Sequence, residues 1–167
     1  MKRKLLLLAV LIMTATISSA QTFGSGDKVL TAQIGLGSSY GLPIAVAYEV
    51  GVVDLGSNFA IGVGATAGYA SKSENDYKYS NLLLGALGNF HYVGLNKWDF
   101  TAGLVLGYDI ASAKWTGTGT EIGTDSASGL LLGLNVGAKY YITESLGIAA
   151  NVGMGIATCQ LGIAYKF

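Results

Sequence analysis

Residues that could do chemistry are few and isolated in this sequence. His91 is the only histidine and Cys159 the only cysteine among 167 residues. A metal site needs several nitrogen, sulfur or carboxylate ligands close together, and Cys159 lacks such partners. It also has no second cysteine with which to form an internal disulfide. We therefore predict no metal or cofactor site, and any histidine-based catalysis would depend on His91 alone.

The first twenty residues have the pattern of a secretory signal peptide. Basic residues at 2–4 precede an apolar run at 5–12, and the small residues Ser18 and Ala20 occupy the −3 and −1 positions before Gln21. The apolar run is much shorter than the roughly 20 residues that a membrane-spanning helix needs. We predict a cleaved signal at 1–20 and one domain at 21–167.

Charge and composition narrow the class of that domain. Of ten basic residues three lie in the signal, which leaves seven against ten acidic residues, a net charge of −3. No basic patch for nucleic acid remains. The chain has 25 glycines but one proline, a composition unlike that of disordered or collagen-like chains. Many small residues must therefore lie inside regular structure.

Alternation of apolar with small or polar residues indicates strands along the whole mature chain. The last strand, CQLGIAYKF, places Leu161, Ile163, Tyr165 and Phe167 on one face. The segment 81–92 alternates least regularly. An open meander would leave two unpaired edges, so we predict an all-β fold, an eight-stranded antiparallel up-and-down transmembrane β-barrel. Its expected strands are 29–38, 44–54, 58–70, 81–92, 98–110, 130–141, 146–156 and 159–167.

Side-chain size decides which face lies outside. The interior of an eight-stranded barrel is just wide enough to be filled by side chains, so the bulky apolar set belongs outside and the glycine-rich set inside. Charge agrees, because a charge facing lipid at the bilayer midplane costs about 2–4 kcal/mol and the strand charges share the glycine face. Five charged or titratable residues on the glycine face are expected in the same half of the lumen, where they would form a salt-bridged plug. They are Glu49, His91, Asp99, Lys139 and Lys166. A proton or ion path is the functional alternative.

The signal ending at Ala20, the eight alternating strands and the terminal Tyr165-Lys166-Phe167 resemble the small outer-membrane β-barrel domain family of the OmpX/OmpA type. The resemblance implies a monomer in the outer membrane, in contact with its lipid. It also implies that Tyr165 and Phe167 form the C-terminal signal for the barrel-assembly machinery. No catalytic residue comes with it, because small barrels that modify lipid A use a histidine near the outer leaflet, whereas His91 threads near a periplasmic turn.

With both termini in the periplasm, the connections at 39–43, 71–79, 112–126 and 157–160 are expected outside. We interpret the chain as a barrel with a filled lumen and a structural or surface-interaction role, not an enzyme, with 71–79 and 112–126 available to an extracellular ligand. The alternatives are a narrow pore for small solutes, a lipid-modifying enzyme, and a soluble lipocalin-like carrier with an apolar interior.

Overall fold

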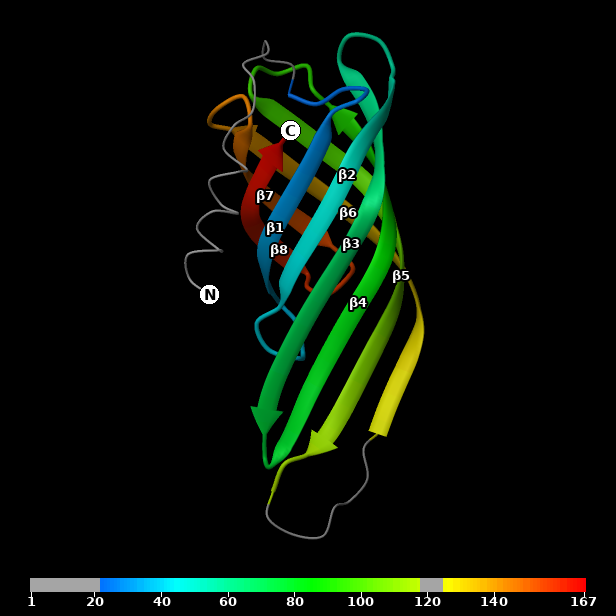
Figure 1. The fold of residues 1–167 in the computed structure, drawn as a ribbon, viewed down its shortest axis with the longest axis vertical. Coiled ribbons are helices and arrows are strands. Elements are labelled where there is room, and N and C mark those ends of the chain that lie inside the picture. Colours follow the sequence, from blue (N-terminus) through cyan, green and yellow to red (C-terminus); the bar gives the residue numbers. More distant parts are fainter. Residues whose placement is uncertain (1–21, 118–124) are drawn as a thin grey trace.

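The alternating segments close into one barrel in the computed structural model, which describes residues 22–117 and 125–167. Every strand pairs antiparallel with its neighbours in the chain, and β8 closes the barrel on β1 (Figure 1). The all-β eight-stranded fold is thus confirmed; the predicted signal at 1–20 lies outside the described residues. Within the described part no helix is long and apolar enough to cross a membrane. The strands are β1 (Lys28–Leu36), β2 (Ile44–Asp54), β3 (Phe59–Glu74), β4 (Tyr77–Tyr92), β5 (Trp98–Trp115), β6 (Asp125–Tyr141), β7 (Leu146–Gly153) and β8 (Cys159–Lys166).

Bulky apolar side chains point outward and small or polar ones inward. Leu106, Leu132 and Ile163 are more than half exposed, whereas His91 and Asp99 are fully buried. The least regular segment follows the same rule, since in β4 Leu84 is exposed and Leu83 is buried. This arrangement overturns the carrier alternative, which needs an apolar interior.

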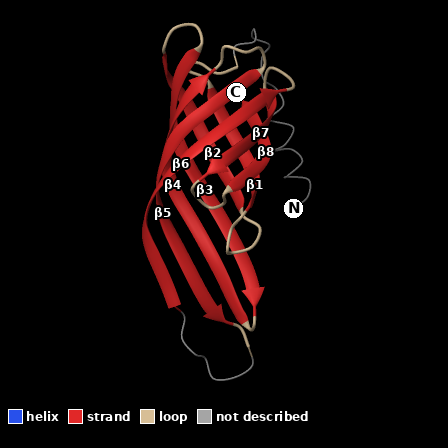
Figure 2. Ribbon diagram, turned by 180° about the vertical axis from the view of Figure 1, so that it is seen from behind, coloured by secondary structure: helices blue, strands red, loops and turns tan. Residues whose placement is uncertain are grey.

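The two ends of the barrel differ in how far the strands extend and in how they are connected. The turn end carries the short turns after β2, β4 and β6 and the C-terminus, whereas at the projecting end β3 to β6 run on well beyond the other strands (Figures 1 and 2). These four strands have 16 to 18 residues, and the others have 8 to 11. Their overhanging part is the projecting sheet, which comprises residues 70–74, 77–81, 111–115 and 125–133.

The connection expected at 71–79 is mostly strand, and the one expected at 112–126 has strand at both of its described ends, which corrects the prediction. β3 and β4 stay paired from Ser71–Ser80 to Glu74–Tyr77, and only Asn75 and Asp76 form the turn, both with positive φ (49° and 61°). β5 likewise runs to Trp115, and residues 118–124 lie outside the described part. The sequence hid this extension because residues 71–80 (SKSENDYKYS) are mainly polar and charged, so they show no alternation of apolar with polar residues.

The seventh strand is shorter than predicted, ending at Gly153 instead of 156. Beyond it the chain turns into the mouth of the barrel, where Ile156 and Ala157 are almost fully buried. They pack with Ala70 of β3 and Leu83 of β4. The apolar residue at 156 continued the strand pattern in the sequence, but its side chain closes the projecting end of the lumen.

Candidate functional site

Four charged side chains meet inside the barrel and form the lumen ion cluster. They come from four strands: Glu49 from β2, His91 from β4, Asp99 from β5 and Lys139 from β6. His91 Nδ1 lies 2.7 Å from Asp99 Oδ1, and its Nε2 lies 2.9 Å from Glu49 Oε1. Lys139 Nζ lies 3.1 Å from Asp99 Oδ2 and 3.5 Å from Glu49 Oε2. The four groups therefore close a ring of alternating acid and base, with side chains at most 7% exposed.

Strand register and one glycine bring the ring together. Asp99 and Lys139 are direct cross-strand partners on β5 and β6. Glu49 instead reaches across β3 to β4, where Asn89 Nδ2 also donates to its Oε1 at 2.7 Å. Gly62 of β3 leaves the path open, because a Cβ there would lie only 2.6 Å from Glu49 Oε1. A side chain at 62 would therefore displace the carboxylate from the ring.

The ring is balanced in charge when His91 is an imidazolium. Both ring nitrogens face carboxylate oxygens, and a neutral imidazole could donate a hydrogen bond to only one of them. The doubly protonated ring satisfies both contacts and gives two cations and two anions. Pairing of this kind is what allows ions to be buried, since an unpaired buried charge costs several kcal/mol.

Lys166, the fifth residue expected in the plug, has its ion pair elsewhere. Its Nζ lies 3.7 Å from Asp27 Oδ2, in the segment before β1, and 5.8 Å from the ring centroid of Tyr141. Lys166 lies on the lumen face of β8, the face on which the alternation of residues predicted it. The structure thus brings four of the five residues into one ring and places Lys166 against the N-terminal segment.

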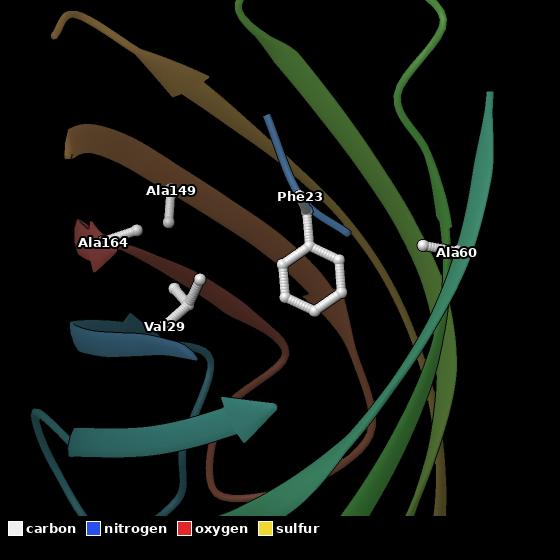
Figure 3. Close-up of a cluster of buried hydrophobic side chains, with 5 residues drawn as sticks. All are labelled: Phe23, Val29, Ala60, Ala149 and Ala164. Atoms are coloured by element: carbon white, nitrogen blue, oxygen red, sulfur yellow. The ribbon is translucent and has the colours of Figure 1, made fainter. Parts of the chain in front are cut away.

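Sequence reasoning missed Phe23, which covers the ion cluster from the turn end. Its side chain is fully buried, and its ring stacks on the imidazole of His91 with centroids 3.8 Å apart and planes 15° apart. Lys139 Nζ lies 5.8 Å from the same ring. Figure 3 shows the phenyl ring inside the barrel wall. The only signal was a single aromatic residue in an otherwise small and polar lead at 21–27.

A small cavity with a mixed polar and apolar lining lies between the ion cluster and the projecting end. It has a volume of about 80 Å³, and Glu49 and Lys139 contribute to its lining. Gln33 Nε2 and Asn89 Oδ1 are buried there without a hydrogen-bond partner in the described part of the chain. Ile156 and Leu83 line the same cavity and belong to the apolar cluster at the projecting end. The remaining polar lining residues are Thr31, Thr66, Thr101, Asn135, Asn151 and Gln160.

The projecting sheet has two strand edges that pair with no other strand among residues 22–117 and 125–167. β6 pairs with β7 only from Asn135 onward, and β3 pairs with β2 only up to Tyr69. On its outer face Lys78 and Lys114 are direct cross-strand partners and both are exposed. On its inner face Tyr77 packs edge-on against Trp115, with ring centroids 4.9 Å apart. The ion pairs of the described residues give neither Lys78 nor Lys114 a carboxylate partner, whereas Lys72 pairs with Glu74 at 2.6 Å.

A closed eight-stranded barrel with an apolar exterior and an ionic interior has the architecture of a membrane-spanning β-barrel. Solved structures of outer-membrane barrels have the same fold. The major outer membrane protein of Thermus thermophilus matches with TM-score 0.64 and 17% identity, over 85% of this chain and all of that one.

Two further structures match at lower identity. Ail, the attachment invasion locus protein of Yersinia pestis, was solved in complex with the heparin analogue sucrose octasulfate. It matches with TM-score 0.54 and 11% identity, over 86% of this chain and 99% of that one. The N-terminal β-barrel domain of Pseudomonas aeruginosa OprF matches with TM-score 0.56 and 13% identity, also over 86% of this chain and 99% of that one. No family model and no curated protein matches the sequence. At such identities the likeness shows the fold, and the fold is that of the OmpX/OmpA-type barrels.

Proposed function

We propose that this protein is a small outer-membrane β-barrel with a sealed lumen, which acts at the cell surface through its projecting sheet and has no enzymatic activity. The single observation that carries this is the contrast between the two regions. The lumen is filled by Phe23, the ion cluster and Ile156, whereas the projecting sheet offers exposed side chains and unpaired edges.

Placement in the membrane follows from the outer face of the barrel. Large apolar side chains cover it, and aromatic residues gather near the turn end, where Trp98 stacks on Phe100 and Phe59 contacts Phe90. Such aromatic bands occur where barrels meet the lipid headgroups. We place the turn end in the periplasm and the projecting sheet outside. Outer-membrane lipid is then a partner, and Tyr165 with Phe167 remains the predicted signal for the assembly machinery of a monomeric barrel.

Absence of catalysis is supported by the way in which His91 is held. Both of its ring nitrogens contact carboxylates within the ion cluster, and Phe23 covers its face. A general base needs a free nitrogen within hydrogen-bond reach of the substrate. His91 offers none, and it lies in the lumen near the turn end, away from the surface that a lipid substrate would reach.

Lys78 and Lys114 suggest the chemistry of a surface ligand. Two ammonium groups on directly opposed strand positions repel each other, and an anion bound between them would relieve that repulsion. A similar barrel, Ail, was solved with the polysulfated sugar sucrose octasulfate. We therefore propose polyanionic saccharides as ligands of the outer face of the projecting sheet.

The test is titration of the folded barrel in detergent with sucrose octasulfate. The double variant Lys78→Ala/Lys114→Ala is expected to bind about ten-fold more weakly, as for two exposed ion pairs. The matched control is Lys28→Ala/Lys97→Ala, which removes the same charge at the turn end and should bind like the parent. Equal affinity of the two double variants, or no binding by the parent, would contradict the proposed ligand class.

A further inference from the structure

The turn end of the lumen is closed by the segment 22–27, which belongs to no strand. Phe23 of this segment is fully buried in a pocket whose walls come from the barrel itself (Figure 3). The pocket is built from small side chains, which leave room for one ring between opposite walls. The wall residues are Val29 of β1, Ala60 of β3, Ala149 of β7 and Ala164 of β8.

The floor of this pocket selects an aromatic side chain. The ring of Phe23 lies parallel to the imidazole of His91 at 3.8 Å, with the ammonium of Lys139 5.8 Å from its centroid. A cation near the face of an aromatic ring is attracted by the ring quadrupole. An aliphatic side chain could fill the same volume, but it would leave these two cations without that contact.

The backbone of the segment is held by a tight turn on the end of β2. Asp27 N donates to Gly24 O at 3.1 Å, and Gly26 has φ +88°, as the third position of a type II turn requires. Gly26 N donates to Gly51 O, and Gly51 N donates to Asp27 O, both at 2.9 Å. Gly51 has to be glycine here, because a Cβ would occupy the place of the Gly24 carbonyl oxygen.

The contacts that hold the segment from outside come from strands of the closed barrel, whose pairing with their neighbours does not involve the segment. Thr22 Oγ1 donates to Trp98 O at 3.2 Å, and Asp54 Oδ1 accepts from Ser25 N at 2.7 Å. Together with Lys166 and Gly51, these partners lie on β2, β5 and β8. The pocket is therefore a property of the barrel, and the segment is its occupant.

We propose that the turn end of the barrel is a preformed binding pocket for an aromatic side chain on a short peptide that forms a tight turn. In this chain it is filled in cis by Phe23, so that segment 22–27 is a plug that can leave while the barrel stays folded. The ligand class is a short peptide with one aromatic residue followed by small residues. The pocket lies at the opposite end of the barrel from Lys78 and Lys114, so failure of either proposal leaves the other standing.

A thiol placed in the pocket wall tests whether Phe23 is the cover. In a Cys159→Ser background, Ala149→Cys is labelled with a small cationic methanethiosulfonate reagent on the folded, detergent-solubilised barrel. The parent should react at least ten-fold more slowly than the same protein with Phe23→Ala. Gly51→Ala should also speed labelling by evicting the Gly24 carbonyl. Gly88→Ala, where a Cβ meets nothing within 4 Å, is the matched control and should stay protected.

A peptide supplied in trans tests whether the pocket is preformed. A barrel lacking residues 22–26 should label rapidly, and the synthetic peptide of residues 22–27 should slow its labelling again. The same peptide with Phe23→Ala should not. Retained faster mobility of the unboiled protein on a detergent gel shows that each variant is folded. Equal rates for the parent and Phe23→Ala, rapid labelling of Gly88→Ala, or no protection by the peptide would overturn the proposal. A deletion variant that does not fold would overturn it as well, because the plug must be able to leave a folded barrel.

Discussion

Lys139 is the residue on which the lumen ion cluster depends most. Its ammonium contacts both carboxylates of the ring, and no other cation besides His91 contacts them among the described ion pairs. Removing one partner of a buried ion pair typically costs about 3–5 kcal/mol. Lys139→Ala should therefore lower the urea midpoint of unfolding clearly, measured by gel mobility in lipid vesicles, whereas the exposed Lys28→Ala should not. An unchanged midpoint together with new ion current would instead favour an ion path.

Individual residues could be predicted from the sequence only where the period of two applies. Alternation put Glu49, His91, Asp99 and Lys139 on one face of four different strands, and the barrel then had to bring them near each other. Lys166 shares that face, but it lies close to Asp27 of the N-terminal segment and forms its ion pair there. Phe23 lies in a segment without periodicity, so its position depends on a three-dimensional pocket that no local pattern encodes.

At the scale of elements, the β3–β4 hairpin depends on its two-residue turn. Asn75 and Asp76 both have positive φ, which a type I′ turn requires and which glycine adopts without strain. Asp76→Gly should therefore slow amide hydrogen exchange at Lys72 and Tyr79, a hydrogen-bonded pair of the hairpin, by roughly five-fold, corresponding to about 1 kcal/mol of relieved strain. Asp76→Val, whose branched side chain opposes this conformation, should accelerate it. Faster exchange in the glycine variant would contradict the assigned turn.

Strand boundaries were predictable inside the bilayer and not beyond it. Lipid on one side and a narrow lumen on the other force large and small side chains to alternate, and β2 has the bounds 44–54 that were expected from this rule. The β3–β4 end of the projecting sheet carries mainly polar and charged residues, so Lys72 to Glu74 and Tyr77 to Ser80 look like a polar loop. Backbone pairing continues there because the hairpin, not apolar burial, holds the two strands in register.

The sealed lumen that we propose makes the whole molecule a closed container with one elaborated end. Phe23 and its segment close the turn end, the ion cluster fills the section behind it, and Ile156 closes the projecting end, with a cavity of only about 80 Å³ between them. The layer of Ile156 also packs on Ala70, at the base of the projecting sheet. The pore alternative would require all three layers to open together.

Electrical measurement on the intact barrel decides between a sealed lumen and a pore. The purified protein should first run faster unboiled than boiled on a detergent gel, since closed barrels resist unfolding by detergent. The same preparation, reconstituted in a planar bilayer, should give no conductance steps, because the charges that could attract ions are already neutralised by one another in the ring. The boiled sample serves as the control for contaminating pores. Regular conductance steps from the folded sample alone would establish a pore, and Lys139→Ala should then change their size because its ammonium would line the path.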